Sequence, residues 1–138
     1  MEFESFYLRC KDIAIKELRR MKINAEDLGV PLGEYDLTES YCIDDTCDCR
    51  KVIINFVEVK RPHRILATIG YGWESLEFYT DWMFGEKEIA KGLKGAYLEM
   101  GGYQSQYSLN FLEVFKARLN DAYIETIKRH YKLFKNMR

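Results

Sequence analysis

The sequence lacks a continuous run of 18 apolar residues, and its first residues do not combine a charged segment with an apolar one. The first absence argues against a transmembrane helix and the second against a secretory signal. Without secretion, the four cysteines are expected to be thiols or metal ligands rather than disulfides. We therefore expect a cytoplasmic protein that does not enter a membrane.

The sequence also lacks an excess of charge of either sign, with a formal net charge of −1. A general attraction to nucleic acid or to anionic lipid is therefore not expected. The charges are nevertheless segregated, because residues 23–49 carry eight acidic groups and no basic one, whereas residues 116–138 carry seven basic and two acidic groups. We expect these faces to neutralise each other within the fold or across a dimer. A basic helix face that contacts phosphate is the alternative.

Signatures of catalysis are absent too. The chain has no nucleophile elbow, no HExxH pair and no glycine-rich phosphate loop. Repeats, low-complexity tracts and linkers are also lacking, so residues 1–138 are expected to form a single domain, long enough to bury a core. These absences favour a protein that is not an enzyme.

What the sequence does contain is hydrophobic periodicity. Apolar residues at three- and four-residue steps predict an amphipathic helix over 3–21 and a long C-terminal helix over 105–135. Residues 74–84 fit either a short helix or a further strand. Alternating or β-branched segments predict three strands, over 35–42, 50–60 and 64–73. The expected fold is α+β, an antiparallel three- or four-stranded meander packed against the N-terminal and C-terminal helices.

Three cysteines gather between the first two predicted strands, in a C-x4-C-x-C arrangement of Cys42, Cys47 and Cys49. If these strands form a hairpin, the first cysteine ends one strand, the last opens the next and the middle one lies in the loop. The three sulfurs then converge without help from the rest of the fold. Because thiolates are soft donors that suit Zn²⁺, the pattern predicts a zinc site.

The fourth ligand is left open by the sequence. His63 is excluded, because about eleven residues of strand at roughly 3.3 Å each separate it from Cys49. The remaining candidates are Asp44, Asp45, Glu74, Cys10 and His130. For Cys10 the competing interpretation is a small apolar core residue, and for His130 it is a hydrogen-bonded structural histidine.

Two hypotheses on function follow. The first is a non-catalytic binding or interaction module that contacts a protein partner or forms a homodimer. In it, Cys42, Cys47 and Cys49 form a structural zinc knuckle. The alternative is a thiol-redox or zinc-dependent enzyme with the knuckle near its active site. A reactive thiol needs a lowered pKa, whereas the aspartates around these cysteines favour the protonated thiols. The first hypothesis is therefore preferred.

Two segments carry a resemblance to known proteins: Tyr41-Cys42-x-Asp44-x2-Cys47-x-Cys49-Arg50-x-Val52 and His130-Tyr131-x-Leu133-Phe134-Lys135. Together they resemble a group of uncharacterised prokaryotic proteins, some of which are similar to proteins with a cysteine-rich, zinc-binding SEC-C tail. These 138 residues contain no such tail. The resemblance implies no activity and adds weight to the prediction of a metal site.

Overall fold

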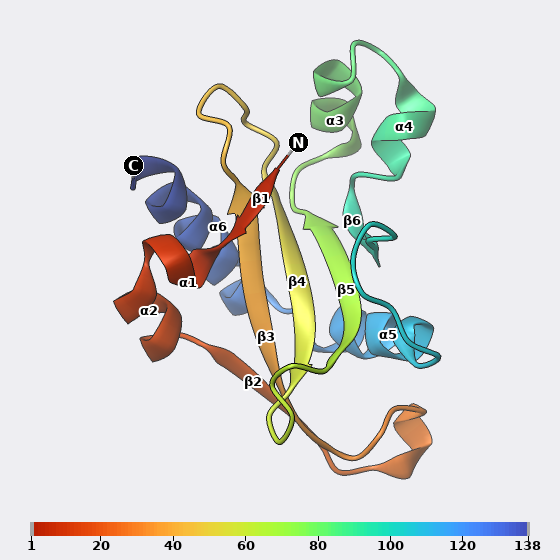
Figure 1. Ribbon diagram of the computed structural model, residues 1–138. Helices are drawn as coiled ribbons and strands as arrows, with labels where there is room; N and C mark the ends of the chain where they lie inside the picture. Colours follow the sequence, from red (N-terminus) through yellow and green to blue (C-terminus); the bar gives the residue numbers. More distant parts are fainter. Residues whose placement is uncertain (1, 138) are drawn as a thin grey trace.

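The computed structural model describes residues 2–137 and has an α+β fold, as expected. A six-stranded antiparallel sheet is flanked by six α-helices in the described chain (Figure 1). The strands are β1 (Phe3–Ser5), β2 (Arg19–Ile23), β3 (Gly33–Cys42), β4 (Lys51–Glu58), β5 (Ile65–Gly72) and β6 (Gly95–Leu98). The helices are α1 (Phe6–Arg9), α2 (Lys11–Lys16), α3 (Leu76–Trp82), α4 (Lys87–Lys91), α5 (Ser108–Arg118) and α6 (Asp121–Asn136).

The centre of the sheet is the predicted meander, with β3, β4, β5 and β6 as successive antiparallel neighbours. The fourth strand is β6, whereas residues 74–84 contribute the helix α3. Both β1 and β2 pair with the outer edge of β3, β1 beside Ser40–Cys42 and β2 beside Gly33–Leu37. This edge is therefore covered by two short strands in succession, with the helices α1 and α2 between them.

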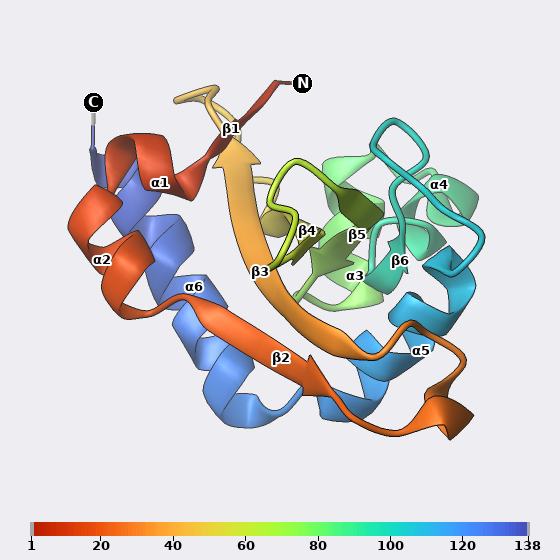
Figure 2. The ribbon, with the colours of Figure 1, turned by 60° about the horizontal axis from the view of Figure 1, so that its bottom comes forward.

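Helices α5 and α6 lie against one face of the sheet (Figure 2). The alternate inward side chains of β3 and β4 meet apolar side chains of these helices there, as in the contact of Phe56 with Phe111, whose ring centroids are 4.9 Å apart. Each such side chain stabilises the fold by about 1.5–3 kcal/mol through its removal from water. The largest fully buried side chains include Tyr35, Leu37, Ile54, Phe56, Phe111, Phe115, Ile127 and Phe134.

The predicted helix over 3–21 is wrong in its extent. The segment begins and ends as the strands β1 and β2, and only its middle forms the short helices α1 and α2. The alternation of Arg20, Met21, Lys22 and Ile23, with Met21 and Ile23 buried, is the period of a strand. Pairing with the free edge of β3 satisfies backbone groups that a helix would have satisfied internally, so tertiary contact decides between the two.

The predicted long helix over 105–135 is two helices, α5 and α6. The break falls at Asn120, whose side chain accepts a hydrogen bond from the backbone N–H of Tyr123 at 2.8 Å. Asparagine is a favoured N-cap because it satisfies a donor that the first turn of a helix leaves free. This cap lets the chain turn, so that α6 packs against β3, as in the contact of Phe134 with Tyr41, and against α1.

Candidate metal centre

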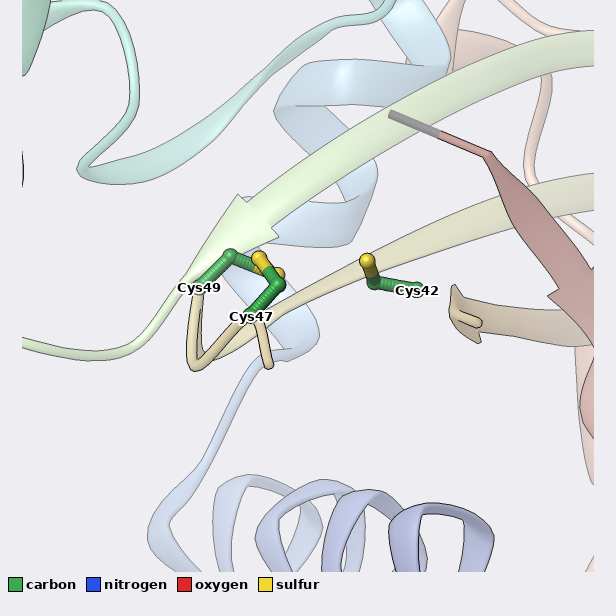
Figure 3. A group of neighbouring side chains, drawn as sticks. All are labelled: Cys42, Cys47 and Cys49. Atoms are coloured by element: carbon green, nitrogen blue, oxygen red, sulfur yellow. The ribbon is translucent and has the colours of Figure 1, made fainter. Parts of the chain in front are cut away.

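The three clustered cysteines meet at the end of the β3–β4 hairpin. Cys42 is the last residue of β3, Cys47 lies in the loop and Cys49 precedes β4. Their sulfur atoms all lie within 4.8 Å of one another (Figure 3). Cys42 and Cys49 are buried, while Cys47 is partly exposed. The three residues predicted as ligands are thus close enough to hold a metal ion.

The spacing of the sulfurs fits a tetrahedral thiolate site. With Zn–S bonds of about 2.3 Å, two sulfurs of a tetrahedron are about 3.8 Å apart. The sulfur cluster therefore needs a contraction of no more than about 1 Å to receive the ion. Small changes in the side-chain torsions of the three cysteines would supply that contraction.

The surroundings of Cys47 and Cys49 favour the protonated thiols when no metal is bound. Burial raises the pKa of Cys49 to about 12, with further increases from the neighbouring Cys47 and Cys42. Burial and the Cys42 thiol also raise the pKa of Cys47. Free thiols with raised pKa values are poor nucleophiles. A metal ion would have to displace these protons, so its binding would be accompanied by proton release.

The first half of the loop is shaped by Asp44. Its carboxylate accepts hydrogen bonds from the backbone N–H of Thr46 at 2.9 Å and from the Thr46 hydroxyl at 2.7 Å. This is an Asx-turn, which folds the chain back so that the Cys47 N–H donates to the Asp44 carbonyl. Lys135 of α6 donates to the same carbonyl at 2.9 Å.

The second half of the loop is held by helices on two sides. Arg50 has a left-handed backbone with φ of 49°, an unusual conformation for a residue other than glycine. The Tyr79 hydroxyl of α3 donates to the Arg50 carbonyl at 2.8 Å, and the Tyr131 hydroxyl of α6 donates to Asp48 at 2.7 Å. Helices distant in sequence therefore fix the turn that presents Cys49. Tyr131 stood in the segment that carries the resemblance, whereas no sequence signal marked Tyr79.

None of the five candidates for the fourth ligand joins the three sulfurs in the described part of the chain. The Asp44 carboxylate bonds to Thr46, and Glu74 pairs with Arg50 at 3.5 Å. Cys10 belongs to the hydrophobic core, in agreement with its competing interpretation. The excluded His63 lies in the turn between β4 and β5, at the opposite end of the sheet (Figure 1).

His130 is engaged elsewhere, between two carboxylates. Its Nδ1 lies 2.7 Å from Glu39 Oε1, and its Nε2 lies 2.7 Å from Glu17 Oε1. It is the hydrogen-bonded structural histidine of the competing interpretation. The sequence signal for this arrangement was Glu39 itself, which was overlooked: it occupies an inward position of β3, between the buried Leu37 and Tyr41.

His130 and its neighbour Glu17 are expected to make the stability of the fold depend on pH. The contribution of His130 is lost as the pH rises, and that of Glu17 is lost as the pH falls. Burial lowers the pKa of His130, but hydrogen bonds and charge from Glu39 and Glu17 outweigh it, and the net pKa is raised. Hydrogen bonds from Arg129 and His130 lower the pKa of Glu17 to about 2. The histidine therefore stabilises the fold fully below about pH 6.5, and this contribution disappears as the pH rises through its folded pKa.

Glu17 makes the free energy of unfolding depend on pH at the acidic end of the range. Its contribution is present above a pH of about 4.5 and disappears as the pH falls toward 2. Urea unfolding of the chain and of Glu17→Gln between pH 2 and about 8 measures both effects. We expect the variant to lose less stability than the native chain on acidification from about pH 4.5. Equal acid slopes for the two proteins would contradict the assignment to Glu17.

Cations of the C-terminal segment contact groups within the fold. Arg129 pairs with Glu17 at 2.7 Å, and Lys128 lies 3.4 Å from Glu125. Arg118 donates to the backbone carbonyl of Lys22. None of these three contacts joins the basic segment 116–138 to the acidic segment 23–49, so the expected neutralisation of one segment by the other stays a prediction. The contacts do leave less free positive charge for phosphate.

Comparisons of the chain with protein-family models, with curated proteins and with solved structures found no match. The resemblance to proteins with SEC-C tails therefore stays a prediction. Among residues 2–137, no helix has both the length and the apolar character needed to cross a bilayer.

Proposed function

We propose that the protein is a non-catalytic binding or interaction module in which Cys42, Cys47 and Cys49 hold a structural zinc ion. The observation that carries this proposal is the approach of three sulfurs to within 4.8 Å at the hairpin end. Zinc is the metal chosen because thiolate donors select it over the hard cations Mg²⁺ and Ca²⁺. A water molecule or an external donor would complete the coordination.

The charge around the cluster supports the same proposal. Zn²⁺ with three thiolates carries a net charge of −1. Lys135 lies close enough to lower the pKa of Cys47, and the backbone N–H of Lys51 hydrogen-bonds Cys49. Positive charge and N–H donors both stabilise thiolates over thiols. These groups partly offset the burial that raises the pKa values of Cys47 and Cys49, and so lessen the cost of the thiolate form that a metal needs.

The proposed role of the ion is to close the hairpin. It would tie the end of β3 to the beginning of β4, where Tyr79 of α3 and Tyr131 of α6 already hold the loop. A metal that binds only the folded chain adds its binding free energy to the stability of the fold. The ion is expected to order this end of the sheet rather than to take part in a reaction.

A zinc-dependent enzyme is the second candidate, because three protein ligands with an open fourth position is the arrangement of catalytic zinc sites. Such an enzyme needs a carboxylate or histidine beside the metal to move protons. Asp48 bonds Tyr131 and Arg50, and Glu74 pairs with Arg50. These partners favour the structural role. The thiol-redox alternative is disfavoured by the raised thiol pKa values.

The metal content of the purified protein tests the proposal. We expect one zinc per chain by elemental analysis, with three of the four thiols protected from thiol reagents by the metal. Chelation should then lower the free energy of unfolding by about 4 kcal/mol, if free zinc had been roughly 1,000 times its Kd. Thermal unfolding with and without chelator measures the loss.

Three outcomes would count against it. Absence of stoichiometric metal together with a chelator-insensitive Tm would overturn the structural zinc. A disulfide between Cys47 and another knuckle cysteine in the purified protein would favour the thiol-redox alternative. Metal-dependent hydrolysis of ester or phosphate substrates, abolished by chelation, would favour the zinc enzyme.

The binding role is proposed from the exposed apolar side chains. Leu8 of α1, Phe84 after α3 and Met100 after β6 are largely exposed, and each offers apolar surface that a partner would remove from water. A protein partner or a second copy of the chain is therefore the expected contact. Light scattering of the zinc-loaded protein over a range of concentrations distinguishes a homodimer from a monomer that awaits another partner.

A further inference from the structure

The outer edge of β3 has a gap between the two short strands that cover it. β1 pairs with β3 down to Ser40, and β2 begins its pairing at Leu37. Thr38 and Glu39 therefore have no strand beside them on this side, while the intervening chain forms α1 and α2. Figure 2 shows these helices standing away from the edge of the sheet, above α6.

A cavity of about 380 Å³ occupies this place. Its walls are largely apolar and come from Phe6, Tyr7, Ala14, Ile15, Leu18 and Leu37. Tyr7, Ile15 and Leu18 are among the exposed apolar side chains of the protein, so the walls reach the surface and leave the cavity accessible. No cysteine of the knuckle lines it.

Buried polar groups form the floor of this cavity. His130 is 1% exposed, and its ring stacks on Phe6 with the centroids 4.4 Å apart. Glu39 is also buried, and its Oε1 accepts from the Tyr41 hydroxyl and lies 2.7 Å from the histidine. The position of this carboxylate is therefore fixed by two side chains before any ligand arrives.

The polar groups at the floor of the cavity can accept hydrogen bonds, but few of their hydrogen-bond donors are free. Tyr41 and His130 both use Oε1 of Glu39, and no hydrogen bond to its Oε2 is found within residues 2–137. Both ring nitrogens of His130 are occupied, and Arg129 donates to both carboxylate oxygens of Glu17. Besides these groups, the side chains of Ser5, Tyr7 and Thr38 bring hydroxyls to the lining.

We propose that this cavity binds a small molecule with an apolar body and a protonated amine, and that the amine hydrogen-bonds to Glu39. Apolar walls with a few convergent, buried polar groups are the usual construction of a small-molecule site. A carboxylate ligand is disfavoured, because it would face Glu39 and Glu17 without a free cation. This proposal does not depend on the zinc site.

Nuclear magnetic resonance titrations of the purified full chain test the site with three probes of similar size. Benzylamine is expected to shift the signals of the cavity residues in a saturable manner. Benzyl alcohol should bind roughly tenfold or more weakly, because it lacks the charge that strengthens the hydrogen bond. Benzoate should cause no saturable shift. Equal affinities for the three probes, or no saturable shift with benzylamine, would overturn the proposal.

Variants at the surface avoid any disturbance of the buried cluster. Ile15→Lys places a cation at the cavity wall and should weaken benzylamine binding at least tenfold. Leu109→Lys is the matched control, because Leu109 is likewise apolar and exposed but does not line the cavity. Its affinity should equal that of the native chain. Unchanged binding in Ile15→Lys, with the native fold confirmed by its spectrum, would place the amine elsewhere and contradict the site.

Discussion

Replacing Cys47 by serine is expected to weaken zinc binding more than about 100-fold. Even the loss of a hydrogen-bond partner of a zinc ligand costs about 10–100-fold in affinity, and the loss of a thiolate ligand should cost more. Cys47 is the best position for this test because it lies in the loop and is partly exposed. The metal-free variant should therefore fold as the metal-free native chain does, and isothermal titration with a competing chelator measures the affinity.

Cys10→Ser provides the matched control for this experiment. Cys10 is the fourth thiol of the chain, but it lies in the hydrophobic core away from the knuckle. Its replacement buries a hydroxyl and is expected to cost about 1–3 kcal/mol of stability without changing zinc affinity. Equal zinc affinities in Cys47→Ser and the native chain would exclude Cys47 as a ligand. A loss in Cys10→Ser instead would point to a different set of ligands.

Removal of His130 is expected to have the largest effect on folding. The imidazole bridges Glu39 and Glu17 and is 1% exposed. His130→Ala leaves the buried Glu39 with Tyr41 as its remaining partner and opens a cavity beside Phe6. Breaking a buried ion pair on one side costs about 3–5 kcal/mol, because a charge is left without compensation. Urea unfolding followed by circular dichroism measures this loss.

A control and a double variant separate the ion pair from general damage to the helix. Lys128→Ala lies on α6 as well and removes only an exposed pair with Glu125, so it should cost less than about 1 kcal/mol. Glu39→Gln combined with His130→Ala removes both charges, and its cost should fall short of the sum of the single costs by about 0.5–3 kcal/mol. Strict additivity would show that the two groups do not act as a pair.

The parts of the fold that sequence predicted well are those with local causes. Strands β3, β4 and β5 follow from alternating or β-branched segments, and the turns between them lie where short polar segments occur. The N-terminal segment was mistaken for one helix because Phe3, Phe6, Cys10 and Ile13 recur at helical steps. Whether such a segment joins a sheet depends on an unpaired strand edge, which is a property of the assembled fold.

The cysteine cluster was predictable because it too has a local cause. Cys42, Cys47 and Cys49 are close in sequence and a hairpin brings their sulfurs together, so adjacency in the chain became adjacency in space. The contacts that hold the loop were not predictable, because Tyr79 and Tyr131 reach it from helices that are remote in sequence. Proximity between distant segments depends on how the helices pack, which local spacing does not encode.

The sequence by itself determined the α+β class, the central hairpin and the three sulfurs at its end. Each of these follows from interactions over a few residues, whose free energies depend little on the rest of the chain. Tertiary structure decided where the polar side chains went: it placed His130 between two carboxylates rather than on the knuckle, and it opened a cavity beside β3. The physical reason is burial, since a buried polar or charged group has to lie where partners from other elements compensate its lost hydration.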